Sequence, residues 1–394
     1  MDDRLFLLTW TALGLSWLIV AWRLAAANAR RSLGKTPEDG SPPDAFSLTL
    51  FKPLPRLGPR GLEVEGPALE SFVAQMDERT EMLLGVHEAD RETAAPFLER
   101  MAREYPGARL RAVFGRPLGG IANPKIAWQK VLAAEALGDL WLWSDADIAA
   151  PPGFLRRARA EFARARGEGI EMVTFPYAVA AAPTVPSLLA ALFVNVEFYP
   201  GVLFLRGLGE GDFGLGAAML FSRDAFARRV DWERLGAALA DDFALGRALR
   251  PVRIGAATVF AVLEPSDARA AVSHYLRWQK TIRWCRPLGF AGQIAVLPVL
   301  GWLGAVLLHP GTAFPWLGLA VVAGAETVLA SLLCREAGCR WRPGHLPMAA
   351  AWSVLRPLVW AACWLPWPVI WRDRRWWGAQ SRPAPEPAFA GQAD

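Results

Sequence analysis

The residues Leu-Trp-Leu-Trp-Ser-Asp-Ala-Asp, positions 140 to 147, form an apolar run that ends in two carboxylates one residue apart. A short apolar run of this kind predicts a buried strand, which places Asp145 and Asp147 at its end. Because alternate residues of a strand share a face, both acids can face one ligand. Two carboxylates this close repel each other unless a cation or a shared proton lies between them. A solvated turn is the other interpretation, but the buried approach favours a site for Mg²⁺ or Mn²⁺ shared with substrate phosphates.

Strands and helices alternate in the sequence that leads to this run. Apolar or alternating stretches predict strands at residues 46–54, 82–86, 110–114 and 140–143, and helical spacing predicts helices at 69–76 and 94–105. This order indicates a mostly parallel α/β sheet. In such sheets ligands bind at the carboxyl ends of the strands, which is where the acids Glu88, Asp90, Asp145 and Asp147 fall.

Apolar residues gather at the two ends of the chain, which has 394 residues, 53% of them hydrophobic. Residues 5–22 carry no charge and, with their flanks, are long enough to cross a membrane. The first four residues are net acidic and positive charges follow the apolar stretch, which favours an uncleaved anchor with its N-terminus outside over a signal peptide. Residues 288–308 and 314–333 predict two further spans, and 347–371 a third segment that Pro357 would kink or make re-entrant.

Another strongly apolar stretch, residues 184–205, lies in the middle of the chain. Hydropathy alone predicts a span, but a crossing would put the acids before it and those after it on opposite sides of the membrane. We therefore expect helices that lie in the membrane interface at about 184–206. The glycine-rich residues 207–216 follow. They predict a flexible or tightly turned loop and not a dinucleotide-binding motif, because no early strand precedes them and no evident helix follows.

These segments predict a chain of five parts: an N-terminal transmembrane anchor (1–30), a linker (31–45), a cytoplasmic domain (46–286), a C-terminal transmembrane region (287–377) and a disordered tail (378–394). The formal net charge is +5, and the basic residues are mostly arginines near the apolar segments. That distribution fits the cytoplasmic surface of a bilayer better than a nucleic-acid interface. The four cysteines are scattered and form no zinc-type cluster with histidine.

Two further groups of charged residues have two interpretations each. Lys125 follows a Gly-Gly loop after the third predicted strand and would act as a point charge near a diphosphate, unless that loop is an ordinary connection. Asp241 and Asp242 open a helix, where the macrodipole favours acids, so capping alone can explain them. Adjacent acids point in different directions, however, so one can cap while the other projects into a site.

Two Arg-Trp pairs, Arg277-Trp278 and Arg283-Trp284, precede the second apolar block. Amphipathic Arg/Trp segments are typical of the membrane interface. The same side chains can equally hold a leaving diphosphate and stack on an acceptor.

Taken in order, seven motifs form a pattern: Phe51-Lys52-Pro53-Leu54, Gly85-Val86-His87-Glu88, Asn123-Pro124-Lys125, Ser144-Asp145-Ala146-Asp147, Phe175-Pro176-Tyr177, Asp241-Asp242-Phe243 and the Arg-Trp pairs. Their order and spacing resemble the ceramide glucosyltransferase family (glycosyltransferase family 21, family 2-like), which includes bacterial hopanoid-associated glycosyltransferases. The resemblance extends over nearly the whole chain.

The resemblance implies an α/β fold, a GT-A nucleotide-sugar domain with a mostly parallel sheet, flanked by transmembrane helices and facing the cytoplasm at a bacterial plasma membrane. It implies a UDP-sugar donor and a divalent cation, Mg²⁺ or Mn²⁺. Asp145 and Asp147 would bind the metal, the ribose and the diphosphate, and Asp242 would be the general base. Glu88 would hold the nucleotide. Because the family usually has Asp there, Asp90 is expected to share or take that role.

The last family motif is Gln or Arg, two further residues and then Arg-Trp; two frames in this chain match its Arg-Trp end, and neither has the usual first residue. We favour Arg277 and Trp278 as its catalytic residues, because the residues after them resemble those after the family motif. The resemblance and the spacing leave these expected substrate-binding residues: Lys125, Asp241, Lys280, Arg283 and Trp284.

The expected reaction is inverting transfer of a sugar, most simply glucose, from the UDP-sugar to the hydroxyl of ceramide or a ceramide-like membrane lipid. Transfer of a sugar such as N-acetylglucosamine to a hopanoid or a diacylglycerol is the nearest alternative. A processive polysaccharide synthase would need more spans than the C-terminal region predicts. A non-catalytic membrane scaffold with a degenerate transferase domain is the alternative outside the enzymes.

Overall fold

The computed structural model describes residues 3–33, 46–58, 60–117, 119–180, 182–209, 211–263, 267–371 and 374–379. Most of the linker expected at 31–45 and of the tail expected at 378–394 lies outside these ranges.

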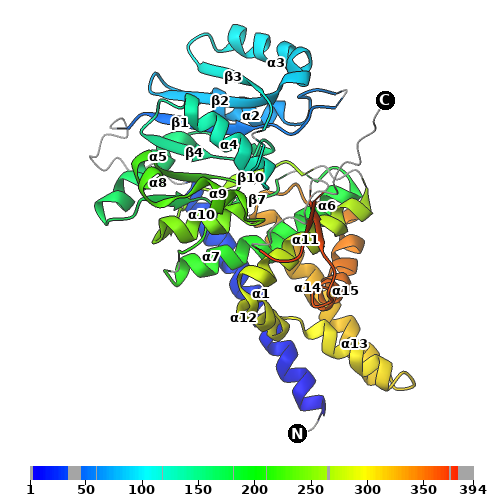
Figure 1. Cartoon of the computed structure of the whole chain (residues 1–394). Coiled ribbons are helices and arrows are strands. Elements are labelled where there is room, and N and C mark those ends of the chain that lie inside the picture. The colour runs from blue at the N-terminus through cyan, green and yellow to red at the C-terminus, as the bar shows by residue number, and fades with distance from the viewer. Residues whose placement is uncertain are drawn as a thin grey trace, which may run out of the picture.

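A seven-stranded sheet forms the centre of the upper half of the molecule in Figure 1. Its order is β3 (Arg109–Gly115), β2 (Thr80–His87), β1 (Leu48–Pro53), β4 (Leu140–Trp143), β8 (Met219–Ser222), β6 (Met172–Thr174) and β9 (Val252–Ile254). Strands β1 to β4 pair in parallel, as do β6 and β9, whereas β8 is antiparallel to both of its neighbours. The expected mostly parallel sheet and its four expected strands are confirmed.

Helices cover both faces of this sheet, which explains why the sequence of β4 is apolar throughout. Leu140 and Leu142 pack on the face covered by α2 (Gly66–Val73), α3 (Arg91–Glu104) and α5 (Phe154–Gly167). Trp141 and Trp143 pack on the other face, against α4 (Pro124–Glu135), α8 (Arg223–Arg229), α9 (Trp232–Gly236) and α10 (Asp241–Leu249). Both faces of β4 are therefore lined by large apolar side chains, and its first polar residue, Ser144, comes directly after the strand ends.

Three segments that follow β4, β6 and β9 in the chain pair with one another in a small second sheet. Strand β10 (Val259–Ala261) lies between β5 (Ile148–Ala149) and β7 (Tyr177–Ala178). It is antiparallel to β5 and parallel to β7. This pairing fixes the turn that carries Asp145 and Asp147 beside the segment that carries Tyr177.

The lower half of the molecule consists of helices (Figure 1). They are α1 (Asp3–Leu33), α6 (Val185–Leu192), the π-helical turn η3 (Phe193–Phe198), α7 (Tyr199–Gly207), α11 (Ala268–Cys285), α12 (Pro287–Gly292), α13 (Pro298–Leu308), α14 (Ala313–Glu336) and α15 (Leu346–Ala362). Three helical segments of the described chain are long and apolar enough to cross a membrane: 3–31, 185–207 and 313–336. Residues 287–296 and 298–308 form a pair bent by 62°, either a broken span or a re-entrant loop.

The continuous helix through α6, η3 and α7 packs against α1, α11, α14 and α15. In Figure 1 it extends from α6 on one side of α1 to α7 on the other, so it crosses the direction of α1. This arrangement supports an interfacial position for the segment, which stays a prediction.

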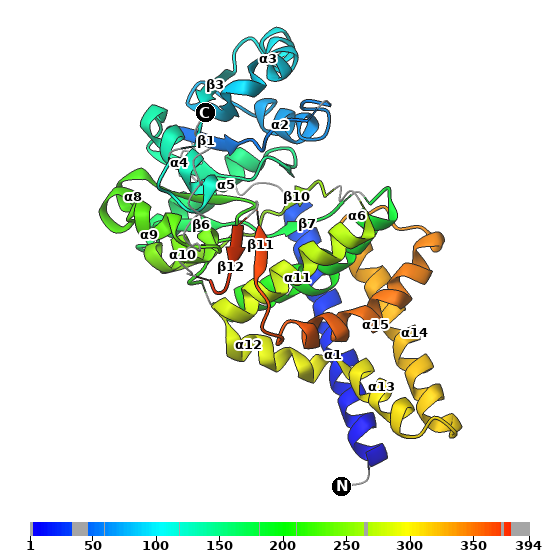
Figure 2. The ribbon, with the colours of Figure 1, turned by 45° about the vertical axis from the view of Figure 1, so that its right-hand side comes forward.

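The expected segment at 347–371 is not one continuous helix. Helix α15 ends at Ala362, and a hairpin of β11 (Val369–Trp371) and β12 (Arg374–Trp376) follows. Trp376 is buried and packs with Leu239 and the partly buried Trp284. In Figure 2 the hairpin lies beside α11, and the Leu239 N–H donates to the Ala379 carbonyl at 3.0 Å, so the end of the described chain returns to the segment just before α10.

Candidate active site

Four segments bring charged side chains together beyond the carboxyl end of β4. Helix α4 begins here because the Asn123 side chain caps it, accepting from the Lys125 N–H at 2.9 Å. The Lys125 ammonium lies 2.6 Å from Asp145 Oδ1 and 3.4 Å from Asp241 Oδ2. The lysine therefore joins the turn after β4 to the first turn of α10.

Gly216 lies at the centre of this group. Its N–H donates to Asp242 Oδ2 at 3.0 Å, and the Phe243 N–H donates to Asp242 Oδ1 at 2.8 Å. A Cβ atom at Gly216 would lie 3.2 Å from Lys125 Nζ and 3.3 Å from Asp145 Oδ2. The glycine thus lets the backbone approach the lysine and both carboxylates, as a tightly turned loop requires.

Burial and crowding disfavour the charged forms of two of these acids. Burial, reinforced by the neighbouring Asp145, raises the pKa of Asp147 to about 7. Burial and the adjacent Asp241 raise the pKa of Asp242 to about 6. Burial lowers the pKa of Lys125, but Asp145 and Asp241 outweigh it and hold that pKa above its usual value. The site therefore has an excess of carboxylates that a further cation would relieve.

Tyr177 belongs to this site, although the sequence analysis did not single it out. Burial raises its pKa, and the carboxylates of Asp242, Asp145 and Asp147 raise it further, whereas Arg277 lowers it. The phenol therefore lies within the electrostatic reach of all three acids and of the arginine. Its position in a Phe-Pro-Tyr motif was the signal in the sequence.

Lys52 is the second residue that the sequence analysis did not assign. It is fully buried and donates to Ser144 Oγ at 2.9 Å, to the Asp145 carbonyl at 2.8 Å and to the Ile148 carbonyl at 3.1 Å. Its ammonium also lies 4.0 Å from the centre of the Phe72 ring. Burial lowers its pKa to about 7, and Asp147 and Asp145 oppose the shift. The lysine holds the backbone of the turn that carries both acids.

The two acids expected at the nucleotide lie at the carboxyl end of β2, in the turn η2 (Glu88–Asp90). The Glu88 carboxylate is half exposed and pairs with Arg91 at 2.9 Å. Asp90 is buried, pairs with Arg56 at 2.9 Å and accepts from the Leu57 N–H at 3.1 Å. Of the two, Glu88 keeps the carboxylate that a ligand can reach, which favours it over Asp90 as the nucleotide contact.

Helix α11 carries both Arg-Trp pairs, and the first pair lies near Tyr177. The Arg277 guanidinium lowers the pKa of the Tyr177 phenol, and the Trp278 ring centre lies 6.4 Å from that of Tyr177. Two hydrogen bonds help to hold this helix, from the Tyr275 hydroxyl and the Gln279 amide to Glu197, at 3.0 Å and 2.9 Å.

The residues around the second pair contact the C-terminal segment. The Lys280 ammonium donates to the carbonyls of Leu365, at 2.9 Å, and of Trp367. The Arg283 guanidinium lies 5.4 Å from the Trp364 ring centre. These contacts favour the frame Arg277-Trp278 at the reaction centre and give Lys280 and Arg283 a role in anchoring that segment.

The donor set fits a cation that the substrate helps to bind. Among the described residues no three His, Cys, Asp or Glu side chains are grouped to hold a metal by themselves. Asp145 and Asp147 supply two carboxylates, and Mg²⁺ is usually held by one or two carboxylates together with substrate phosphates. The protein thus offers part of a coordination shell.

The sheet, the acids at the carboxyl end of β4 and at the start of α10, and the apolar helices define a GT-A glycosyltransferase with segments long enough to span a membrane. The family description "Glycosyl transferase family 21" matches residues 8–382. The chain therefore belongs to glycosyl transferase family 21, as the order of its motifs predicted.

Comparison with known proteins gives distant structural relatives. A mannosyltransferase from Pyrobaculum calidifontis in complex with GDP-Man and Mn2+ is 17% identical over 90% of this chain and 98% of its own, with a TM-score of 0.43. S. aureus TarS in complex with UDP-GlcNAc is 11% identical over 79% of this chain and 92% of its own, with a TM-score of 0.34. A comparison with curated protein sequences gives no match.

Proposed function

We propose that the protein transfers a sugar, most simply glucose, from a UDP-sugar to the hydroxyl of ceramide or a ceramide-like lipid, at the cytoplasmic face of a bacterial plasma membrane. The observation that carries this proposal is the meeting of Lys125, Asp145 and Asp242 around Gly216. It combines a carboxylate whose pKa is raised with groups suited to a diphosphate and a divalent cation. Membership of the family and the adjoining apolar helices support a lipid as the acceptor.

Asp242 is the proposed general base. It accepts the proton of the acceptor hydroxyl as that oxygen attacks the anomeric carbon, while the bond from that carbon to the UDP oxygen breaks. Attack from the face opposite the leaving group inverts the carbon, so an α-linked donor gives a β-glycoside. A positioned general base contributes about 10²- to 10⁴-fold to such a step.

The leaving diphosphate is the proposed partner of the cationic part of the site. Lys125 is held between Asp145 and Asp241 and supplies a fixed positive charge, and Arg277 supplies a second. Asp145 and Asp147 would hold Mg²⁺ or Mn²⁺, which neutralises charge on diphosphate oxygens when bound. Glu88 would contact the nucleotide.

The raised pKa of Asp242 predicts an acid limit for transfer. The base must be ionised, so a pKa of about 6 means that kcat/KM falls as the pH drops through about 6. An ordinary aspartate, with a pKa of about 3.9, would stay ionised well below that. The measurement is the initial rate of UDP release between about pH 4.5 and 8 at lipid concentrations well below KM. A rate that stays level down to about pH 4.5 would contradict the assignment.

Replacing Lys52 with methionine tests the support of the acid turn. The change leaves Ser144 Oγ and two carbonyls without their donor, so Asp145 and Asp147 lose their fixed position. We expect the Mn²⁺ concentration for half-maximal transfer to rise about 10- to 100-fold, the usual effect of losing a residue that orients a metal ligand.

The matched control is Arg159→Met. Arg159 is also buried and donates to Thr80, at the opposite end of the sheet. This variant should lower the melting temperature without changing the Mn²⁺ requirement. An equal change in Mn²⁺ requirement in both variants would show that Lys52 stabilises the fold in general and does not specifically position Asp145 and Asp147.

The experiment that tests the proposed reaction is UDP release by the purified full-length protein in lipid vesicles, with and without Mn²⁺. UDP-glucose and UDP-N-acetylglucosamine are the donors, and the vesicles contain ceramide, diacylglycerol or a hopanoid polyol. We expect release that needs both the divalent cation and an acceptor lipid. Release with only a hopanoid or a diacylglycerol would identify that lipid as the acceptor in place of ceramide. No release from any combination would favour the non-catalytic scaffold.

A further inference from the structure

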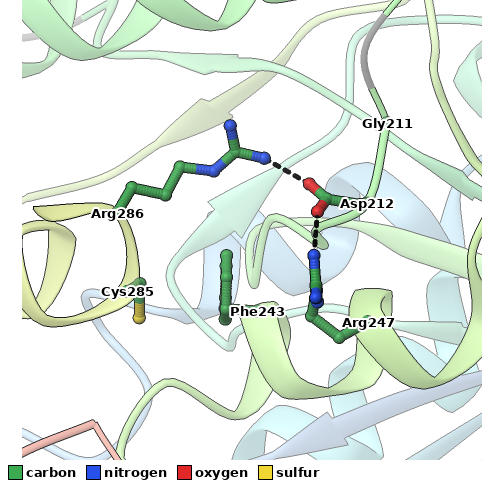
Figure 3. Close-up of a pocket in the computed structure, with 6 residues that line it drawn as sticks. All are labelled: Gly211, Asp212, Phe243, Arg247, Cys285 and Arg286. Carbon is green, nitrogen blue, oxygen red and sulfur yellow. Dashed lines mark hydrogen bonds and ion pairs between the residues drawn. The ribbon is translucent and has the colours of Figure 1, made fainter. Parts of the chain in front are cut away.

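Two cavities adjoin each other between α10 and the end of α11. The larger has a volume of about 450 Å³ and is lined by Gly211, Asp212, Phe243, Arg247, Cys285 and Arg286 (Figure 3). The smaller has a volume of about 300 Å³ and is lined by Ala238, Ala240, Phe243, Ala244, Trp284, Cys285 and Ala379. Phe243 and Cys285 line both, so the two cavities share a wall.

The larger cavity is lined by three charged side chains, Asp212, Arg247 and Arg286. Figure 3 shows the Asp212 carboxylate reached by Arg247 from α10 and by Arg286 from the end of α11, with the Phe243 ring beside them. The Arg286 guanidinium also lies 5.0 Å from the centre of the Phe213 ring. Two guanidinium groups beside one carboxylate give this cavity many N–H donors, which suit an oxygen-rich polar group.

The described residues that line the smaller cavity carry no charged side chain. Alanine methyl groups and the Trp284 side chain make up its wall beyond Phe243 and Cys285. Hydrocarbon binds in such a place because it leaves water, at about 25 cal/mol for each Å² of apolar surface buried. A ligand that fills both cavities must therefore have a polar end and a hydrocarbon part.

The shared wall connects the cavities to the proposed base. The Phe243 N–H donates to Asp242 Oδ1 at 2.8 Å, so the residue between the two cavities also holds the carboxylate. Burial and then the Asp242 charge raise the pKa of the Cys285 thiol to about 12, so that thiol lies within the electrostatic reach of the base. A ligand in these cavities therefore contacts Phe243, the residue that follows the proposed base and donates to its carboxylate.

The cavities also lie where the chain enters its membrane region. Helix α11 ends at Cys285, and α12 begins the bent apolar pair at Pro287. Leu288, two residues after Arg286, has 87% of its surface exposed. A lipid can reach this point from the bilayer, whereas a soluble acceptor would gain nothing from the exposed leucine.

We propose that the two cavities together form the acceptor-lipid site. The polar end of the lipid lies against Asp212, Arg247 and Arg286, and its hydrocarbon part lies against Ala244 and Trp284. This inference rests on the proposed function, because it places the acceptor hydroxyl beside Asp242. It goes further by assigning the acceptor class, an amphiphile with an oxygen-rich head, to named residues outside the donor site.

The test is Ala244→Trp, which fills the smaller cavity with an indole ring. The matched control is Ala248→Trp, on the same helix, at a partly buried position that lines neither cavity. Native mass spectrometry of the full-length protein gives the Kd for short-chain ceramide, dioctanoylglycerol and a hopanoid polyol, and titration gives the Kd for UDP-glucose. We expect Ala244→Trp to weaken lipid binding at least about tenfold and donor binding less than about twofold, and the control to change neither.

A melting temperature shows whether Ala244→Trp has folded, and Arg247→Gln provides a second variant because the Arg247 side chain is half exposed. Arg247→Gln should weaken binding of the same lipid without changing the donor Kd. Equal lipid binding in both folded variants and the wild type, or no binding of any of the three lipids, overturns the acceptor site. If Ala244→Trp removes lipid binding but the protein releases UDP from no donor, the lipid site is supported and the proposed reaction is overturned.

Discussion

Replacing Asp242 with asparagine is expected to lower the rate of sugar transfer by about 10²- to 10⁴-fold while the Kd for the UDP-sugar changes less than about twofold. Asparagine has nearly the same shape and can still accept from the Phe243 N–H through Oδ1. It loses the acceptor for the Gly216 N–H, which costs about 1 kcal/mol, and it cannot take a proton from a hydroxyl. The rate comes from UDP release and the Kd from calorimetry.

Asp224→Asn is the matched control, because Asp224 is also an acid in the first turn of a helix and is exposed on α8. It should keep the wild-type rate. If Asp242→Asn loses donor binding as completely as transfer, Asp242 is a donor ligand and the base assignment fails.

Replacing Asp147 with asparagine is expected to have the second largest effect, on the metal. The change removes one of the two carboxylates that would hold the divalent cation, so the Mn²⁺ concentration for half-maximal transfer should rise at least about 100-fold, the upper end of what losing an orienting residue costs. Burial and Asp145 already disfavour the Asp147 carboxylate without a cation, so the metal-free variant should melt no lower than the wild type. A Mn²⁺ titration of UDP release and a melting curve measure both.

Asp90→Asn makes the same chemical change at a buried acid of the same domain. Asp90 pairs with Arg56, so its loss should lower the melting temperature and leave the Mn²⁺ requirement unchanged. An unchanged Mn²⁺ requirement in Asp147→Asn would remove Asp147 from the metal site. A raised Mn²⁺ requirement in Asp90→Asn would show instead that Asp90 takes part in binding the donor.

The sequence predicts the acid-bearing strand well because that signal is local. A run of four large apolar residues that ends in Ser-Asp-Ala-Asp has one simple explanation, a strand buried on both faces, and the structure confirms it in β4. The helix that starts at Asp241 is local in the same way. Its first-turn acids are visible in the sequence before any tertiary contact is known.

The roles of Lys52 and Tyr177 depend on the order of strands, which spacing along the chain does not reveal. Strand β1 pairs with β4, so Lys52 reaches Ser144, 92 residues further along the chain. Strand β7 pairs with β10, which in turn pairs with β5 beyond Asp147, so Tyr177 comes close to the acids. A lysine within an apolar strand and a tyrosine after Phe-Pro were the available signals.

The end of the membrane region shows the limit of hydropathy. Residues 347–371 are apolar almost throughout, so hydropathy alone does not separate the helix that ends at Ala362 from the strand that begins at Val369, and Pro366 and Pro368 between them are the local signal for the break. The strand forms because a partner, β12, returns beside it and buries Trp376 near Leu239.

The most direct test of the proposed reaction is mass spectrometry of lipids extracted from cells that express the protein and are supplied with ceramide or hopanoid precursors, beside cells that express Asp242→Asn. We expect a hexosylceramide that appears only with the wild-type protein. A glycosylated hopanoid or diacylglycerol in its place would keep the mechanism and change the acceptor. The absence of any new glycolipid would contradict lipid glycosylation by this protein.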